Sequence, residues 1–181
     1  MIGFLCNLIP HILIVVWFGG SFEGPLPAWF LATLAVLYFT YMVADNSDGK
    51  QARRTGTSSP LGMLLDHGMD SVTTVVNNFI MQRVLQLGNC YMNMVGMLVS
   101  SVPFYFAVLE QYYTGEFLLQ VVNGVDDGSF LYMAMCLLPA LYGTDFWKQE
   151  IDLFAGRYPP MPLNHLLVLG LLVVLSLSAL D

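Results

Sequence analysis

The sequence predicts an all-α protein that crosses a membrane about six times. Hydrophobic residues make up 56% of the 181-residue chain and charged residues only 10%, with a mean hydropathy of +0.65. Such a composition is typical of membrane proteins. The apolar residues also gather into six runs, most of them near the ~20 residues that cross ~30 Å of hydrocarbon. We interpret the whole chain, residues 1–181, as one domain.

Each apolar run is predicted to form one helix, in the order Ile2–Phe18, Ala28–Ala44, Val72–Leu87, Tyr91–Leu109, Phe130–Trp147 and Leu163–Leu180. The first, second, fourth and sixth runs contain no Asp, Glu, Lys or Arg. Polar or helix-breaking residues interrupt the other two: Asn77, Asn78, Gln82 and Arg83 in the third run, and Pro139, Gly143 and Asp145 in the fifth. Their polar atoms are expected to face protein rather than lipid.

The basic residues predict the orientation. Three of the six lysines and arginines, Lys50, Arg53 and Arg54, follow the second run, and an excess of basic residues marks cytoplasmic loops. We therefore place this connection in the cytoplasm, although Lys148 and Arg157 oppose the assignment. If each run crosses the membrane once, the connection after the fourth run also lies in the cytoplasm. The connections after the third and fifth runs then lie on the opposite side of the membrane.

Charge and cysteine content argue against two classes of function. The formal charge is −7 and no basic stripe is present, so the sequence predicts no nucleic-acid partner. Cys6, Cys90 and Cys136 fall in or beside apolar runs without paired spacing. Neither a disulfide framework nor a zinc site is predicted.

Four aspartates are the most informative feature of the chain. Asp45 and Asp48 are spaced i,i+3, and Asp66 and Asp70 are spaced i,i+4, so each pair occupies one face of a helix. Carboxylates that converge where two helices meet repel one another unless cations bridge them. Hard divalent ions such as Mg²⁺ prefer oxygen ligands, and two of them would balance the four charges. We predict such a site at the cytoplasmic ends of the helices.

The spacing of these aspartates belongs to a longer pattern. It reads D-x2-D-G-x2-A-R-x8-G-x3-D-x3-D, with its fixed positions at Asp45, Asp48, Gly49, Ala52, Arg53, Gly62, Asp66 and Asp70. The pattern resembles the signature of the CDP-alcohol phosphotransferases. The flanking K-Q-A-R-R-T, S-S-P-L-G and D-H-G-M-D-S segments, with E-Q-Y-Y-T-G from Glu110, resemble the choline/ethanolamine phosphotransferase branch. The resemblance extends from about Gly3 to at least Trp147.

This resemblance implies an enzyme that transfers phosphocholine or phosphoethanolamine from CDP-choline or CDP-ethanolamine to the hydroxyl of diacylglycerol. CMP and phosphatidylcholine or phosphatidylethanolamine would be the products, with Mg²⁺ or Mn²⁺ as the cofactor. The resemblance also implies an endoplasmic reticulum or Golgi membrane, with the site facing the cytoplasm. A homodimer is compatible with Gly96–Ser101, because small residues permit close packing between helices.

The expected metal ligands are Asp45, Asp48, Asp66 and Asp70. For Arg53 the resemblance implies contact with the CDP group, and a planar guanidinium suits phosphate recognition. The adjoining motif positions expected at the nucleotide are Gly49, Ala52 and Gly62. The two glycines lack side chains that would obstruct a ligand. A position in a loop between helices would also explain both glycines.

His67 is the expected catalytic base. Histidine changes charge near neutral pH, this one adjoins Asp66, and the resemblance implies that it takes the proton from the diacylglycerol hydroxyl. An alternative gives the proton to a carboxylate such as Asp70 and leaves His67 in a supporting role.

The chain departs from the resembling branch in two ways. Met63 stands where that branch usually has a glutamate thought to orient the histidine, and a thioether accepts hydrogen bonds only weakly. We therefore expect either reduced activity or a different acid, such as Glu110, in the role of the missing glutamate. The chain also begins inside its first apolar run and ends after six runs, whereas the branch has about ten helices. We therefore expect a partial version of the family domain.

Other interpretations remain open. A shortened chain with Met63 is consistent with a pseudoenzyme or a regulatory partner of a full-length paralogue. An enzyme that uses CDP-diacylglycerol would share the aspartate motif but not its flanking segments. A channel or transporter is disfavoured, because the aspartates gather at one membrane face instead of spreading through the bilayer midplane.

Overall fold

Six α-helices dominate the computed structural model, which describes residues 2–115, 126–153 and 156–178. They are α1 (Ile2–Phe18), α2 (Ala28–Thr55), α3 (Pro60–Val84), α4 (Tyr91–Thr114), α5 (Asp126–Tyr142) and α6 (Leu163–Ser178). A short 3₁₀ helix, η1 (Thr144–Lys148), follows α5. Two antiparallel strands, β1 (Glu150–Ile151) and β2 (Met161–Pro162), pair Glu150 with Pro162 and Ile151 with Met161.

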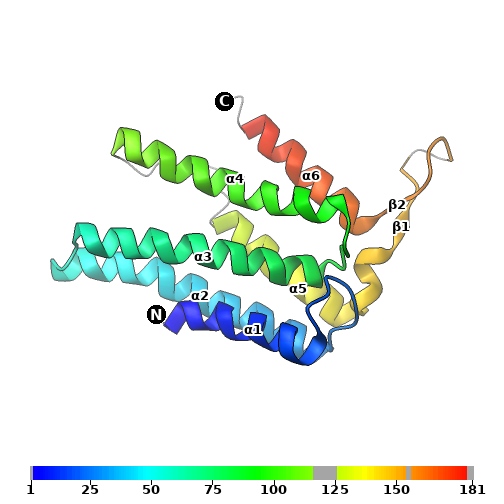
Figure 1. Cartoon of the computed structure of the whole chain (residues 1–181), viewed down its shortest axis with the longest axis horizontal. Helices are drawn as coiled ribbons and strands as arrows, with labels where there is room; N and C mark the ends of the chain where they lie inside the picture. Colours follow the sequence, from blue (N-terminus) through cyan, green and yellow to red (C-terminus); the bar gives the residue numbers. More distant parts are fainter. Residues whose placement is uncertain (1, 116–125, 154–155, 179–181) are drawn as a thin grey trace.

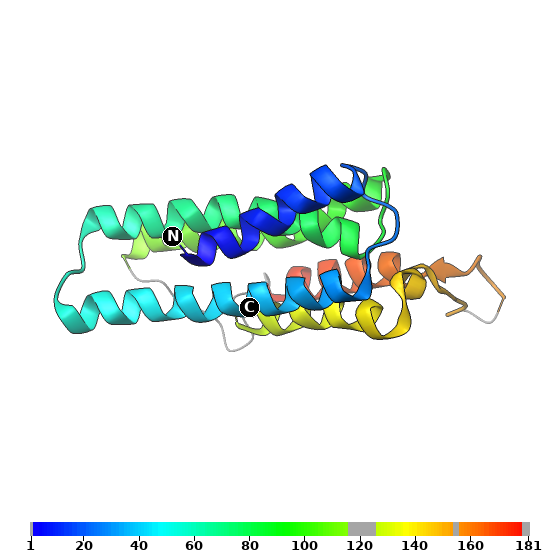
Figure 2. The same ribbon diagram turned by 90° about the horizontal axis from the view of Figure 1, so that it is seen from below.

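The helices pack side by side in an elongated bundle (Figure 1). α1 packs against both α2 and α3, α5 packs along α2, and α4 contacts both α3 and α6. Figure 2 shows the long α2 and α3 running together to the turn that joins them, away from the β1–β2 hairpin. The turns after α1, α3 and α5 gather at the hairpin end of the bundle (Figure 1). This agrees with the predicted alternation of connections between two sides.

Two buried apolar clusters hold the bundle together. The larger cluster joins α1, α2, α3 and α5 and includes Phe30, Leu34, Ile80 and Cys136. The second cluster lies around Trp147, whose indole Nε1 donates a 3.3 Å hydrogen bond to the carbonyl oxygen of Met135. The larger cluster therefore fixes α2 and α3, which carry the four aspartates, within one core.

The observed helices differ from the apolar runs mainly where polar sequence continues a helix. α1 matches the first run, but α2 continues past Ala44 to Thr55 and α3 begins twelve residues before Val72, at Pro60. The fifth run was predicted to reach Trp147, which is wrong, because α5 ends at Tyr142 and Gly143 has a φ of 97°. A positive φ suits glycine and breaks the helical path.

Only two helices within the described ranges, α2 and α4, combine the length and apolarity needed to cross a membrane. Segments of α1, α5 and α6 form shorter apolar helices. Six crossings therefore stay a prediction. Among the interrupting polar residues, Asn78, Gln82 and Arg83 are buried in protein as predicted, whereas Asp145 is exposed because it lies beyond α5, in η1.

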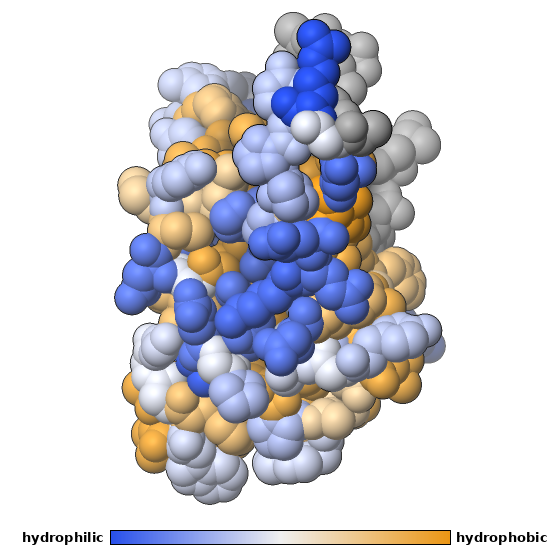
Figure 3. Space-filling model, turned by 90° about the vertical axis from the view of Figure 1, so that its right-hand side faces the viewer, coloured by the Kyte–Doolittle hydropathy of each residue, from blue (hydrophilic) through white to orange (hydrophobic). Residues whose placement is uncertain are grey.

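The end of the bundle that carries β1 and β2 is polar. Figure 3 faces this end and shows hydrophilic side chains gathered over its centre, with hydrophobic ones around them. Buried side chains tie its loops together: Asn164 Nδ2 donates 2.9 Å to the carbonyl oxygen of Leu85, and Gln86 Nε2 donates 2.7 Å to that of Gly24. This end is therefore built by hydrogen bonds between separate turns.

The small residues of Gly96–Ser101 pack within the chain. A Cβ added at Gly96 would lie 3.7 Å from a methyl group of Leu87. Ser101 Oγ accepts a 3.1 Å hydrogen bond from Asn78 Nδ2, and Ser100 Oγ donates one to the side-chain oxygen Oδ1 of Asn78. Parts of this stretch thus join α4 to α3, and the homodimer stays a prediction.

Candidate active site

The turn between α2 and α3 brings the aspartates together. Gly56 ends α2 with a φ of 68°, the left-handed conformation that terminates many helices. Ser59 then begins α3 by accepting a 3.0 Å hydrogen bond from the backbone N–H of Gly62. Asp45 precedes the end of α2 by ten residues, and Asp70 follows the start of α3 by ten residues. Since each helical residue advances ~1.5 Å, the two carboxylates reach the same level of the hairpin.

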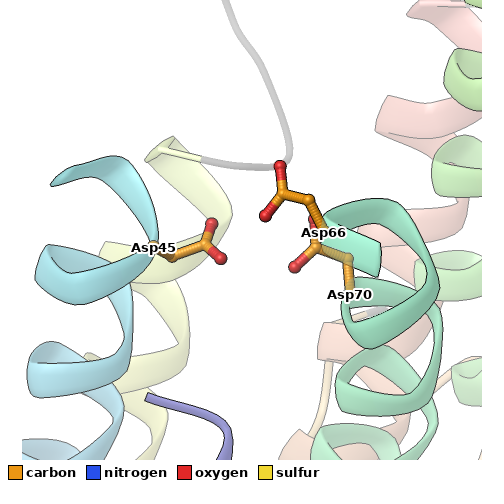
Figure 4. A group of neighbouring side chains, drawn as sticks. All are labelled: Asp45, Asp66 and Asp70. Atoms are coloured by element: carbon orange, nitrogen blue, oxygen red, sulfur yellow. The ribbon is translucent and has the colours of Figure 1, made fainter. Parts of the chain in front are cut away.

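Three aspartates converge between the two helices. One carboxylate oxygen each from Asp45, Asp66 and Asp70 lies within 4.8 Å of the others. Figure 4 shows Asp45 reaching from α2 toward Asp66 and Asp70 on α3, so the three side chains point into one space. These oxygens are close enough for a single cation to contact all three, and oxygen ligands suit Mg²⁺ or Mn²⁺.

Asp48 lies at the edge of this group. Its side chain is exposed on α2 and is outside the three-residue cluster. Its charge nevertheless acts on Asp66, whose pKa is raised by burial and then by Asp48. The structure therefore brings three of the four predicted ligands within 4.8 Å of one another and leaves the fourth as their electrostatic neighbour.

Burial and neighbouring groups both shift the pKa of Asp70. Burial raises the pKa of Asp70, and the charge of Asp66 adds to that rise. A hydrogen bond from Tyr41 and the nearby His67 act in the opposite direction. A bound cation favours the ionised form of neighbouring carboxylates that otherwise oppose one another's ionisation. The three aspartates offer oxygen ligands only, which suits such a cation.

His67 lies on α3 between two of the clustered aspartates. Its side chain is half-buried, and its backbone carbonyl accepts a 2.8 Å hydrogen bond from Ser71 Oγ. Met63 precedes it by one helical turn and is 53% exposed. Gln111, near the end of α4, places its amide nitrogen 3.9 Å from the Met63 sulfur. Glu110 is exposed beside Gln111, so the end of α4 brings polar groups toward the start of α3.

The predicted nucleotide-binding positions lie along the same hairpin. Gly49 and Ala52 are half-buried on α2, and Arg53 is exposed. A Cβ at Gly49 would lie 3.6 Å from the Arg53 guanidinium. Gly62 lies at the start of α3, where a Cβ would come 3.3 Å from Ser59 Oγ. The helix cap accounts for Gly62 in structural terms, and its contact with a nucleotide stays a prediction.

A mostly apolar groove borders the site. It runs between α3 and α4 and is lined by Ser71, Thr74 and Val75 on one side and by Phe104, Tyr105 and Val108 on the other. Ser71 directly follows Asp70 in the chain. The groove therefore lies beside the turn of α3 that carries Asp70.

Tyr41 is a site residue that the sequence analysis missed. Its hydroxyl donates a 3.1 Å hydrogen bond to Asp70 Oδ1. The available signal was its position four residues before Asp45, since residues at i and i+4 share a helical face.

The fold and site define a helical, apolar protein with a carboxylate cluster suited to divalent cations. The chain belongs to the CDP-alcohol phosphatidyltransferase family, whose model matches residues 4–138. Members of this family are membrane phosphotransferases, and the resemblance of the aspartate motif predicted this membership.

Individual relatives agree with this assignment. The chain is 39% identical over 142 residues to uncharacterized CDP-alcohol phosphatidyltransferase class-I family protein 3 of Dictyostelium discoideum, covering 78% of this chain and 36% of the relative. It is 32% identical to choline/ethanolaminephosphotransferase 1 of Arabidopsis thaliana, over 83% of this chain and 38% of the relative. Cholinephosphotransferase 1 of Xenopus laevis is also 32% identical, over 95% of this chain and 41% of the relative. The chain thus spans about two fifths of the length of these relatives.

Proposed function

We propose that this chain transfers phosphocholine or phosphoethanolamine from a CDP-alcohol to diacylglycerol, with divalent cations held by Asp45, Asp48, Asp66 and Asp70. The convergence of Asp45, Asp66 and Asp70 within 4.8 Å carries the proposal, because it forms a compact oxygen donor set for Mg²⁺ or Mn²⁺. Similarity to proteins named for choline and ethanolamine phosphotransfer supports the choice of substrates.

In the proposed reaction, the hydroxyl oxygen of diacylglycerol attacks the phosphorus that carries the alcohol. A new P–O bond forms as the bond from that phosphorus to the bridging oxygen breaks, and CMP departs with this oxygen. The hydroxyl proton passes to His67, which adjoins Asp66. Bound divalent cations would offset the charge of the diphosphate and stabilise the entering and leaving oxygens.

The surrounding residues suit two substrates of opposite character. Arg53 is exposed on the last turn of α2, where its guanidinium can bind phosphate oxygens of a nucleotide that arrives from water. The groove between α3 and α4 includes Ser71, the residue after Asp70, and its apolar walls suit the acyl chains of diacylglycerol. We assign the site to the cytoplasmic face of an endoplasmic reticulum or Golgi membrane.

The test is phosphoalcohol transfer by the purified chain in micelles that contain diacylglycerol. CDP-choline and CDP-ethanolamine are compared at several Mg²⁺ and Mn²⁺ concentrations, with circular dichroism to verify the helical fold. We expect CMP and phospholipid to form only when a divalent cation is present, and the faster CDP-alcohol identifies the headgroup. A folded chain that binds CDP-alcohol without transfer would contradict the catalytic proposal and favour a non-catalytic partner.

A further inference from the structure

We propose that Tyr41 is a positioning residue of the candidate active site, whose hydroxyl holds the Asp70 carboxylate in the orientation that a divalent cation requires. The inference rests on the proposed function, because it concerns the cation site assigned there. It adds a residue outside the aspartate motif and specifies how that residue acts.

The first support is the hydrogen bond between two helices. Tyr41 is half-buried on α2, one turn before Asp45, and its hydroxyl donates 3.1 Å to Asp70 Oδ1 on α3. α2 thus supplies one cluster carboxylate directly through Asp45 and acts on a second through Tyr41. Because the bond crosses from α2 to α3, it couples the orientation of Asp70 to the packing of the hairpin.

The second support is the chemistry of a carboxylate. An ionised carboxylate has two acceptor oxygens, and the bond from Tyr41 engages Oδ1 of Asp70. The bond restricts rotation of the carboxylate and so fixes the directions in which its remaining lone pairs meet a cation. Hydrogen bonds to the ligands of a metal orient them, and their removal typically costs about 10–100-fold in metal affinity or activity.

The third support is that the tyrosine ring is itself held in place. A Cβ added at Gly3 of α1 would lie 3.4 Å from Cδ2 of Tyr41 and 3.3 Å from Cβ of Ala44, so the backbone of α1 packs closely on this turn of α2. On the previous turn, the ring of Tyr38 lies 5.8 Å from that of Tyr41 between centroids. These contacts keep the hydroxyl directed at Asp70.

Tyr38 also provides a matched control. Its hydroxyl lies 3.2 Å from Ser129 Oγ and makes its bond to a serine instead of an aspartate. Tyr38→Phe and Tyr41→Phe each remove one hydroxyl from the same face of α2. A merely structural role predicts similar effects for the two variants, whereas a positioning role predicts a difference in cation binding.

The experiment measures Mn²⁺ binding to the metal-free chain in micelles by electron paramagnetic resonance, together with thermal unfolding in EDTA. We expect Tyr41→Phe to weaken Mn²⁺ binding about tenfold, and Tyr38→Phe to bind Mn²⁺ as the wild type does. The unfolding midpoints of the two metal-free variants should be similar.

Two results would overturn the inference while leaving the proposed function intact. One is Mn²⁺ binding by Tyr41→Phe at the wild-type affinity, and the other is equal weakening in both variants. An Asp66→Asn variant separates this failure from a broader one. If the wild type binds Mn²⁺ no better than Asp66→Asn, the cation site itself is wrong, and the proposed function falls together with the role of Tyr41.

Discussion

The guanidinium of Arg83, near the end of α3, donates a 3.0 Å hydrogen bond to the carbonyl oxygen of Phe18, the last residue of α1. The same group donates to the carbonyl oxygens of Ser21 and Glu23 in the following turn. The last carbonyls of a helix lack intrahelical partners, and a cation there also complements the helix dipole. Arg83 therefore ties the end of α1 and its loop to α3.

Replacing this arginine should destabilise the bundle. Arg83 is only 3% exposed, so Arg83→Met leaves the partly buried carbonyl oxygens without their charged donor and should lower the free energy of unfolding by about 2–3 kcal/mol. Thermal unfolding in micelles measures the loss. Arg54→Met serves as the control, because Arg54 is exposed on α2 and its replacement should have little effect. Equal stability of the two variants would show that the bonds of Arg83 contribute nothing net.

Asp66→Asn should abolish cation-dependent transfer. The amide removes one of the three charges that converge within 4.8 Å, so cation affinity and activity should fall by about 100-fold or more. Transfer assays across Mg²⁺ concentrations measure the effect. Asp145→Asn, at an exposed position on η1 at the other end of the bundle, should behave as the wild type does. Unchanged turnover in Asp66→Asn would remove the basis for a cation clamp.

Without metal, the stability of the chain should fall as pH rises. Burial raises the pKa of Asp66 and of Asp70 above the ordinary value of 3.8, so above that pH the folded chain retains protons that the unfolded chain has released. Stability decreases with pH wherever the folded state binds more protons. The penalty is absent below 3.8 and complete once pH exceeds the raised values.

Thermal unfolding in EDTA, followed from about pH 4 to about pH 8, measures this dependence. The midpoint should decline over this interval, and added Mg²⁺ should restore most of the loss at the upper end. Asp70→Asn should decline less steeply, because it lacks one of the titrating groups. A wild-type midpoint that rises with pH would contradict the prediction.

Met63→Glu should raise the transfer rate if His67 is the base. Met63 precedes His67 by four residues on α3, so both share a helical face, and a carboxylate at this position can orient and stabilise a protonated imidazole. His67→Ala should lower the rate about 100-fold, and Met63→Glu should give no gain in that background. Leu64→Glu controls for added charge, because Leu64 is 69% exposed on the next position of α3.

The opposite pattern has a clear meaning. If Met63→Glu leaves the rate unchanged and His67→Ala is harmless, the proton goes to a carboxylate such as Asp70. That result would retain the cation site and reassign only the base.

The spacing of the aspartates predicted their convergence because helical periodicity is a local property. Asp66 and Asp70 had to share a face once α3 formed, and the short turn between Gly56 and Ser59 places α2 alongside. Periodicity did not distinguish Asp48 from Asp45, because the rotation of α2 relative to α3 depends on the buried cluster that joins them. That packing brings Asp45 inward and leaves Asp48 exposed.

By itself, the sequence determined the mainly helical class, the family and the identity of the acidic residues. These follow from composition, apolar runs and motif spacing, which are all readable along the chain. Only the tertiary structure decided that Tyr41 reaches Asp70 and that Ser101 of the Gly96–Ser101 stretch bonds to α3. Such contacts join residues far apart in sequence, so they depend on how the helices rotate and pack against one another.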